Sequence, residues 1–327
     1  MNPLQDWINK LGHLPVAPLI GYPGARLTGT TLRENLFDAG THANSLRAIG
    51  SRWHPDILLP MMDLSVEAAA LGLSVRFPDN ESPTVEEHPV RDSADLDRFG
   101  AADIVADPRL QSFLSTILEL ADRAETSLGA YVVGPFTLTG LLMGANEAAI
   151  ATIRNPDLVH AVLQFSTRVS RAYTHACVEA GADLIVILEP TAVLLSPVAF
   201  SEFSGQYVQS IASDCSAISV LHICGDTTAL LDAMCETGVH GLSLDSVVDF
   251  GVAIKNVPQS IVLIGNVDPV RVMGAADPSV VTTAVRDLLK AMKGHRNFIL
   301  STGCDLPLDT PPENIDKLIH TARDPRV

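Results

Sequence analysis

The chain alternates between short, almost continuously apolar runs and longer segments in which apolar residues recur every three or four positions. The short runs are typical of parallel strands buried on both faces, and the longer spacing is typical of helices. We predict strands at residues 16–21, 57–61, 130–134, 184–189, 217–223, 241–245, 260–265 and 297–301. The predicted helices with the plainest start and stop signals cover 158–180, 197–214 and 278–293.

Alternation of strands and helices over the whole length predicts an α/β fold, a (β/α)8 TIM barrel that forms a single domain over residues 1–327. An open doubly wound sheet is the second possibility, but no GxGxxG follows the first strand. Residues 72–92 are polar and rich in turn formers. We expect a small hairpin there, inserted after the second strand as an embellishment of the barrel.

Polar or turn-forming residues follow every predicted strand, where a TIM barrel places its active site. These strand ends are Gly21-Tyr22, Asp63, Gly134-Pro135-Phe136, Glu189-Pro190, His222-Ile223-Cys224, Asp245, Asn266-Val267-Asp268 and Gly303-Cys304. A single such position is explained by an ordinary turn, whereas recurrence at all eight favours a site. We therefore expect a substrate pocket lined by Tyr22, Asp63, Glu189, Asn266 and Asp268. Phe136 and Met143 lie near its entrance, where packing in the core is their more ordinary role.

The segment LHICGD carries the sharpest chemical signal, because residues two apart in a strand point to the same side. His222 and Cys224 can therefore bind one metal ion, and imidazole and thiolate are ligands that zinc prefers. Cys304 is the third expected ligand, since barrel closure brings all strand ends to one rim. Asp245 is the favoured fourth, displaceable ligand and Glu189 the alternative; either can instead orient His222 or contact substrate.

A zinc ion with two thiolate ligands activates water poorly but binds a thiol well and removes its proton. Such a site suits alkyl transfer to sulfur. A purely structural zinc site is the alternative, although these sites normally have four Cys or His ligands and this chain offers three. The remaining cysteines, Cys177, Cys215 and Cys235, fall in helical patterns and are expected to pack.

Charge and composition exclude other classes of protein. With 22 basic and 38 acidic side chains the net charge is −16, which is unsuited to nucleic-acid binding. No apolar run approaches the roughly 20 residues that cross a membrane, and the first residues lack the pattern of a signal peptide. We expect a cytoplasmic protein without disulfides, since its five cysteines are an odd number spread along the chain.

Several segments together resemble the uroporphyrinogen decarboxylase superfamily, and within it the methyltransferase branch that includes the methylcobamide:coenzyme M methyltransferases. The resemblance rests on the order and spacing of GYPGARLTGTT, MDLSVEAAALG, GPFTLTGLLMG, GADLIVILEPTAVLLSPVAFSEF, HICGDTTALLDAM, GLSLDS, IGNVDP and FILSTGCDLPLDTPPENI. It implies a barrel in which His222, Cys224 and Cys304 bind zinc. Asp245 matches the acidic ligand position of cobalamin-independent methionine synthase, which this chain also resembles.

The resemblance further implies a methyl group exchanged with a corrinoid carried by a partner protein. The acceptor would be a thiol such as coenzyme M, or tetrahydrofolate, and we expect an exposed apolar rim where the corrinoid protein docks. Three alternatives stay open. They are a methyltransferase working from a small methoxylated or methylamine donor to the corrinoid, a uroporphyrinogen-type decarboxylase, and a module that only binds a metal or a tetrapyrrole. Arg26 is the single cation in GYPGARLTG, too few for a substrate with many carboxylates.

Overall fold

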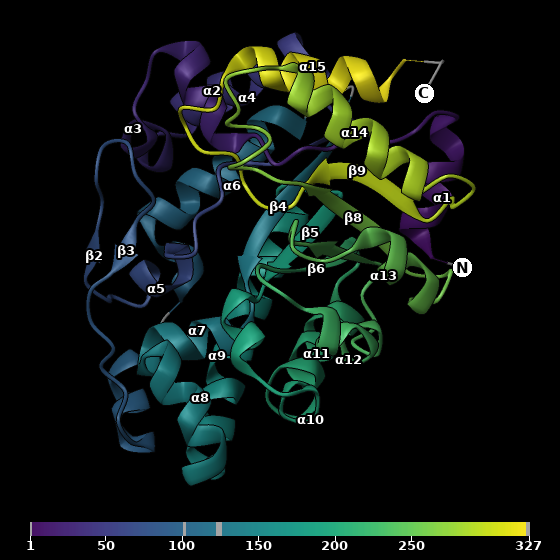
Figure 1. The fold of residues 1–327 in the computed structure, drawn as a ribbon. Coiled ribbons are helices and arrows are strands. Elements are labelled where there is room, and N and C mark those ends of the chain that lie inside the picture. The colour runs from purple at the N-terminus through teal and green to yellow at the C-terminus, as the bar shows by residue number, and fades with distance from the viewer. Residues whose placement is uncertain (1, 101–102, 122–125, 325–327) are drawn as a thin grey trace.

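The computed structural model describes residues 2–100, 103–121 and 126–324 (Figure 1). Its main sheet holds seven strands, all parallel and in chain order. They are β1 (Ile57–Leu58), β4 (Ser127–Val133), β5 (Leu184–Leu188), β6 (Ile218–Ile223), β7 (Gly241–Leu244), β8 (Val262–Val267) and β9 (Phe298–Thr302). The strand order without a reversal excludes the doubly wound sheet and confirms the predicted TIM-barrel class.

Residues 15–17 close the sheet into a ring. Val16 forms a parallel bridge with Leu300 in β9, and on its other side its carbonyl accepts the backbone N–H of Asp56, next to β1, at 2.9 Å. The predicted strand at 16–21 is therefore wrong in its length. Pro15 and Pro18 have no N–H to give to a ladder, and helix α2 already begins at Gly21.

The expected hairpin follows β1. Strands β2 (Val75–Arg76) and β3 (Thr84–Val85) pair in antiparallel fashion, with Val75 opposite Val85. They form a sheet separate from the barrel and lie to the left in Figure 1.

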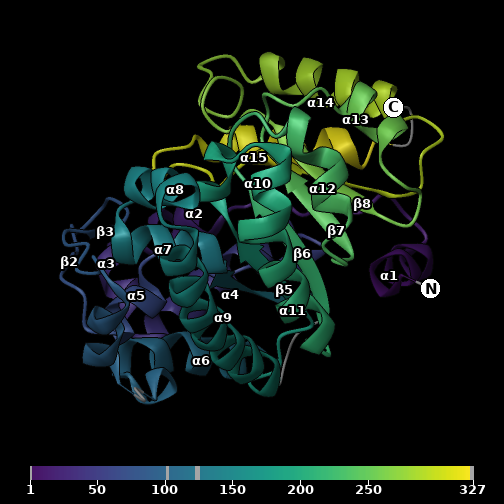
Figure 2. The same cartoon turned by 90° about the horizontal axis from the view of Figure 1, so that it is seen from below.

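Helices surround the ring on the outside, and in Figure 2 α9 and α11 lie alongside β5 and β6. The α-helices are α1 (Pro3–Leu11), α2 (Gly21–Thr28), α3 (Leu32–Phe37), α4 (Ala39–Trp53), α5 (Val66–Ala70), α6 (Pro108–Ala121), α7 (Pro135–Met143), α8 (Ala145–Arg154), α9 (Pro156–Glu179), α10 (Pro197–Phe200), α11 (Gln206–Asp214), α12 (Leu231–Cys235), α13 (Phe250–Asn256), α14 (Ser279–Ala291) and α15 (Pro312–Ala322). Short 3-10 turns are η1 (Ser93–Phe99), η2 (Ile104–Ala106), η3 (Pro190–Leu194) and η5 (Thr228–Leu230).

The helix expected over 197–214 is interrupted by a π-helical turn, η4 (Ser201–Gly205), between α10 and α11.

Two apolar cores hold the layers together. One fills the space between the strands and the surrounding helices. The other fills the inside of the ring, where Leu4 and Ile8 of α1 pack beneath strand residues such as Val186 and Val220. Because α1 also hydrogen-bonds where the strands begin, through Trp7 to Ser127, it closes that end. Only the opposite end, where the strands finish, is left to form a site.

No single helix in the described part of the chain is long and apolar enough to cross a membrane. Helices α7 and α8 taken together have the length and apolar composition of a membrane span, but they are bent by 101° against each other.

Glu67 in α5 braces this helix against β4 from a fully enclosed position. Its side chain is 1% exposed, and Oε1 accepts the backbone N–H of Val133 at 2.7 Å. Burial raises the pKa of Glu67 to about 7, although the Val133 bond opposes the shift. The folded protein therefore binds the Glu67 proton more tightly than the unfolded chain does.

A Glu67→Gln variant tests this brace, since the amide oxygen can still accept the Val133 N–H. The contribution of Glu67 to the free energy of unfolding falls as pH rises from about 4.5 to about 7. We expect Glu67→Gln to be more stable than the wild type at pH 8 by about 3 kcal/mol and equally stable near pH 4.5. Denaturant unfolding at both pH values measures this, with the exposed Glu81→Gln as control. Equal stability at pH 8 would contradict the assignment.

Candidate functional site: a His-Cys-Cys cluster at the barrel mouth

Three side chains with metal-binding atoms meet where β6 and β9 end. His222 Nε2 lies 3.1 Å from Cys224 Sγ, the two Sγ atoms of Cys224 and Cys304 are 3.2 Å apart, and Cys304 Sγ is 3.8 Å from His222 Nε2. His222 is 1% exposed, while both cysteines are partly exposed. The cluster is thus held from below and open on the side of the sulfur atoms.

Two glycines allow the chain to form this cluster. Gly225, which follows Cys224, has a φ of +90°, a left-handed conformation that favours glycine. Gly303 precedes Cys304 and packs so closely against the end of β7 that an added Cβ would lie 2.4 Å from the backbone N of Ser246. A side chain at either position would displace the neighbouring cysteine.

Ser243 on β7 fixes the imidazole. It lies directly opposite His222 in the parallel ladder, and its Oγ is 2.9 Å from His222 Nδ1. This contact leaves Nε2 directed at the two sulfur atoms. A partner on the second ring nitrogen is the usual way in which proteins orient a metal-binding histidine.

The contact between the two cysteines shifts their pKa values in opposite directions. The hydrogen bond with Cys224 lowers the pKa of Cys304, and His222 contributes in the same direction. The same hydrogen bond, together with burial, raises the pKa of Cys224. The contact therefore favours the thiolate of Cys304, and the thiolate is the form of cysteine that binds metals.

The two candidate fourth ligands lie in different surroundings. Asp245 accepts the backbone N–H of Gly225 at 2.8 Å and the hydroxyl of Ser246 at 3.1 Å, so it is next to the cluster but outside its ligand atoms, which all lie within 4.8 Å of one another. Glu189 is 0% exposed and accepts N–H groups of the first turn of α7, at 2.8 Å from Phe136. Asp245 is the better placed of the two, and its role as a ligand stays a prediction.

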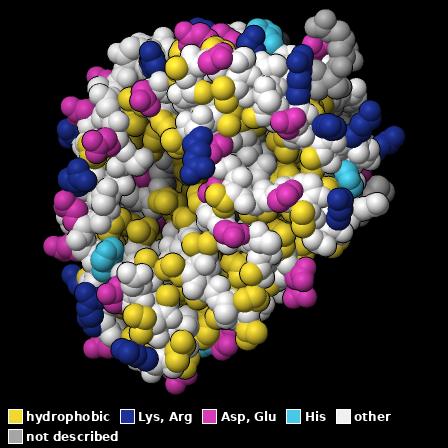
Figure 3. All heavy atoms as spheres, viewed as in Figure 1, with side chains coloured by type: hydrophobic (Ala, Val, Ile, Leu, Met, Phe, Trp, Pro, Cys, Tyr) yellow, Lys and Arg dark blue, Asp and Glu magenta, His cyan; other side chains and the backbone are white. Residues whose placement is uncertain are grey.

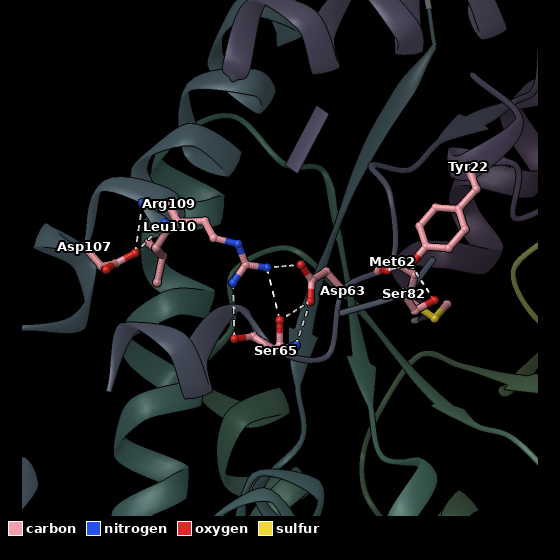
Figure 4. Close-up of polar contacts among 8 residues, drawn as sticks. All are labelled: Tyr22, Met62, Asp63, Ser65, Ser82, Asp107, Arg109 and Leu110. Atoms are coloured by element: carbon pink, nitrogen blue, oxygen red, sulfur yellow. Dashed lines mark hydrogen bonds and ion pairs between the residues drawn. The ribbon is translucent and has the colours of Figure 1, made fainter. Parts of the chain in front are cut away.

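Asp63, expected in the pocket, is engaged by the protein itself. Figure 4 shows it between Arg109 and Ser65: one carboxylate oxygen pairs with the Arg109 guanidinium, and the other accepts the N–H and hydroxyl of Ser65 at 2.8 and 2.7 Å. The guanidinium also lies 4.6 Å from the centre of the Phe77 ring. This buried ion pair ties the loop after β1 to α6 and to the hairpin, and a contact of Asp63 with substrate stays a prediction.

The other expected pocket residues also have protein partners. The Tyr22 hydroxyl donates to the Met62 carbonyl at 2.8 Å, as Figure 4 shows. The Asn266 amide donates to the carbonyl oxygens of Asp245 and Val248, and the Asp268 carboxylate accepts backbone N–H groups of its own loop. Phe136 and Met143 are 0% and 4% exposed, which places both in the core.

Three residues near the cluster were missed by the sequence argument. The contact of Ser243 with His222 cannot be predicted without the register of β6 and β7. Asp305 directly follows Cys304, and both of its carboxylate oxygens are buried without a hydrogen bond of normal geometry among the described residues. Tyr131 lies inside the ring on β4, and its strand pattern carried no sign of a polar role.

The surface offers a second concavity that is distant from the cluster. A hollow of about 1150 Å³ lies between α1, α14 and the starts of β4 and β9, lined by Trp7, Ser127 and Phe298 among others. It belongs to the end of the barrel that α1 closes.

Figure 3 shows the face of Figure 1, where apolar side chains gather over the lower half.

A parallel barrel with an imidazole and two thiols at its mouth defines a class of barrel proteins suited to metal-assisted chemistry on sulfur. The sequence model of one family, uroporphyrinogen decarboxylase (URO-D), matches residues 9–325. The chain belongs to this family.

Relatives with two kinds of activity are found. A methylcobamide:CoM methyltransferase MtbA from Methanosarcina mazei is 32% identical over 273 residues, which is 81% of this chain and 78% of that protein. A uroporphyrinogen decarboxylase from Paraburkholderia phytofirmans is 27% identical over 285 residues, 82% of this chain and 77% of that protein.

Solved structures agree on the fold. A methyltransferase from Methanosarcina mazei superposes with a TM-score of 0.87 at 24% identity, over 95% of this chain and 93% of that one. A B12-independent methionine synthase from Shewanella sp. W3-18-1 follows with a TM-score of 0.59 at 11% identity, over 95% and 94%.

Proposed function

We propose that this protein is a zinc-dependent, corrinoid-dependent methyltransferase that moves a methyl group between a methylated corrinoid protein and an acceptor thiol. The cluster of His222, Cys224 and Cys304 carries the proposal. The relatives named as methylcobamide:CoM methyltransferases support it. A thiol of the coenzyme M kind is the expected acceptor, with tetrahydrofolate as the alternative.

The donor set fits zinc. One nitrogen and two sulfur atoms bound tetrahedrally to zinc, at about 2.0 and 2.3 Å, would be about 3.5 to 3.8 Å apart. The observed N–S separations of 3.1 and 3.8 Å lie on either side of the tetrahedral value, and the S–S separation of 3.2 Å would have to widen by about half an ångström. Three protein ligands would leave a fourth position for a substrate.

Zinc in this site would supply one thing, the removal of the proton from an acceptor thiol whose own pKa is roughly 8.5. The chain supplies the rest. Ser243 holds the ring of His222, and the backbone N–H of Gly225 holds Asp245 beside the open position. We propose that Asp245 would occupy that position until a thiol displaces it.

Methyl transfer from the corrinoid then balances simply. The acceptor sulfur would donate an electron pair to the methyl carbon and form the carbon–sulfur bond. The methyl group would leave the corrinoid with the bonding pair kept on cobalt, and the thiol proton would go to solvent. The protein would have to hold the acceptor sulfur in line with the carbon–cobalt bond, about 3 to 3.5 Å from the methyl carbon.

Decarboxylation of a porphyrinogen is the second candidate, and the decarboxylase relative keeps it open. The many carboxylates of a porphyrinogen would need cationic side chains near the barrel mouth. Arg109 is 6% exposed and paired with Asp63, and Arg26 donates to the Asp309 carbonyl at 3.1 Å. Because both arginines are already bound by the protein itself, they favour the methyltransferase over the decarboxylase.

An apolar rim fits the docking of a corrinoid protein. Large exposed apolar side chains follow the ends of β5, β7 and β8, where a surface this apolar is typical of a protein interface. They are Leu194 (51% exposed), Val198 (77%), Val247 (62%) and Val270 (65%).

Metal content is the first test of this function. We expect about one zinc per chain in the wild type and almost none in Cys304→Ser, because two remaining ligands hold zinc weakly. Cys235→Ser, which alters a partly exposed cysteine of α12, should retain the full zinc content. Elemental analysis of the purified proteins measures this, and full zinc in Cys304→Ser would remove Cys304 from the site.

Transfer of the methyl group is tested with free methylcobalamin and 2-mercaptoethanesulfonate. We expect zinc-loaded protein to bleach the cobalt–carbon absorbance in step with thioether formation, and Cys224→Ser to lose more than about 100-fold of this rate. Tetrahydrofolate replaces the thiol in a parallel reaction to separate the two acceptors. Unchanged absorbance with both acceptors, together with carbon dioxide release from uroporphyrinogen, would instead establish a decarboxylase.

Docking is tested by charge introduced at the rim. We expect Val247→Asp to raise the KM for a methylated corrinoid protein about 10-fold, because an unpaired charge is buried in the interface, and to leave turnover of free methylcobalamin unchanged. Leu118→Asp is the matched control, since Leu118 is 57% exposed on α6. An equal KM for Val247→Asp and the control would contradict docking at this rim.

A further inference from the structure

Tyr131 is a buried tyrosine whose hydroxyl has no partner. The residue is 6% exposed and packs among the apolar side chains inside the ring. Among the described residues, its hydroxyl is enclosed and makes no hydrogen bond. An unpaired buried hydroxyl destabilises a fold, and a phenylalanine would fill the same space without this cost.

Tyr131 lies one layer of strand residues below the cluster. Tyr131 lies level with Val186 on β5, which is level with Val220 on β6, and His222 is two residues further toward the mouth. Tyr131 therefore belongs to the layer directly below His222.

Its electrostatic surroundings agree. Burial raises the pKa of Tyr131 well above 10, and Asp305 and Cys304 raise it further. The Tyr131 hydroxyl is thus among the groups of the cluster, not among those of the outer helices.

Tyr22 provides a comparison within the same site. Its hydroxyl donates to the Met62 carbonyl at 2.8 Å and lies 3.0 Å from Ser82 Oγ. The fold can therefore satisfy a tyrosine hydroxyl near this mouth, yet it leaves that of Tyr131 unpaired.

We propose that the Tyr131 hydroxyl donates a hydrogen bond to an oxygen atom on the tail of the acceptor thiol, and so places the acceptor sulfur at the cluster. The inference rests on the proposed function and narrows its substrate to small thiols that carry an oxygen about two carbons from sulfur. Because the Tyr131 and His222 layers are only two strand residues apart, about 6.7 Å along the strand direction, a short tail is the kind that fits between the two layers.

A comparison of ligands isolates this contact. Calorimetry on zinc-loaded protein measures the Kd of 2-mercaptoethanol and 2-mercaptoethanesulfonate, which carry the oxygen, and of 1-propanethiol, which lacks it. We expect Tyr131→Phe to raise the Kd of the two oxygenated thiols about 10-fold and to leave the Kd of 1-propanethiol unchanged. An equal effect on all three thiols, or none, would overturn the inference.

Stability of the metal-free protein gives an independent readout. Because the hydroxyl has no partner to lose, Tyr131→Phe should leave Tm unchanged or raise it, whereas Tyr22→Phe should lower it. A Tm lowered in Tyr131→Phe as much as in Tyr22→Phe would assign the hydroxyl a structural role and overturn the inference.

Failure of the Tyr131 contact and failure of the proposed function give different results. Wild-type protein that binds zinc but binds all three thiols equally well would overturn the role of Tyr131 and leave the methyltransferase standing. Wild-type protein that binds neither zinc nor thiol would overturn both.

Discussion

The site depends on closure of the ring, because only closure brings the ends of β6 and β9 to the same rim. Cys224 and Cys304 are 80 residues apart in the chain, yet their sulfur atoms are 3.2 Å apart. The short segment around Val16 replaces a full strand between β9 and β1. Its hydrogen bonds to β9 therefore help to position Cys304, which follows this strand.

Buried polar groups around the mouth divide into those that build the walls and those left for a ligand. Asp63 with Arg109, and Glu189 with the start of α7, use their hydrogen bonds to fix loops. Hydrogen bonds to the protein offset the free-energy cost of burying these polar groups. Among the described residues the Tyr131 hydroxyl has no such partner, and it lies beside the cluster, where a ligand can accept its hydrogen bond.

Much of this arrangement could be predicted from residues alone. The apolar runs located seven strands, and the spacing of His222 and Cys224 with the strand-end position of Cys304 predicted which three side chains meet. The first strand was misjudged because apolar residues around Pro18 look like a strand while the ring nitrogen cannot donate to a ladder. Ser243 and the partners of Asp63 could not be predicted, since they depend on strand register and on loop packing between distant segments.

The central claim is that three protein ligands hold zinc and leave one position for a thiol. Zinc K-edge X-ray absorption on the zinc-loaded protein, with and without 2-mercaptoethanol, tests it most directly. The account predicts two sulfur ligands at about 2.3 Å without the thiol and three with it. A fourth protein ligand that added thiol does not displace, or a sulfur count that does not change on adding thiol, would contradict it.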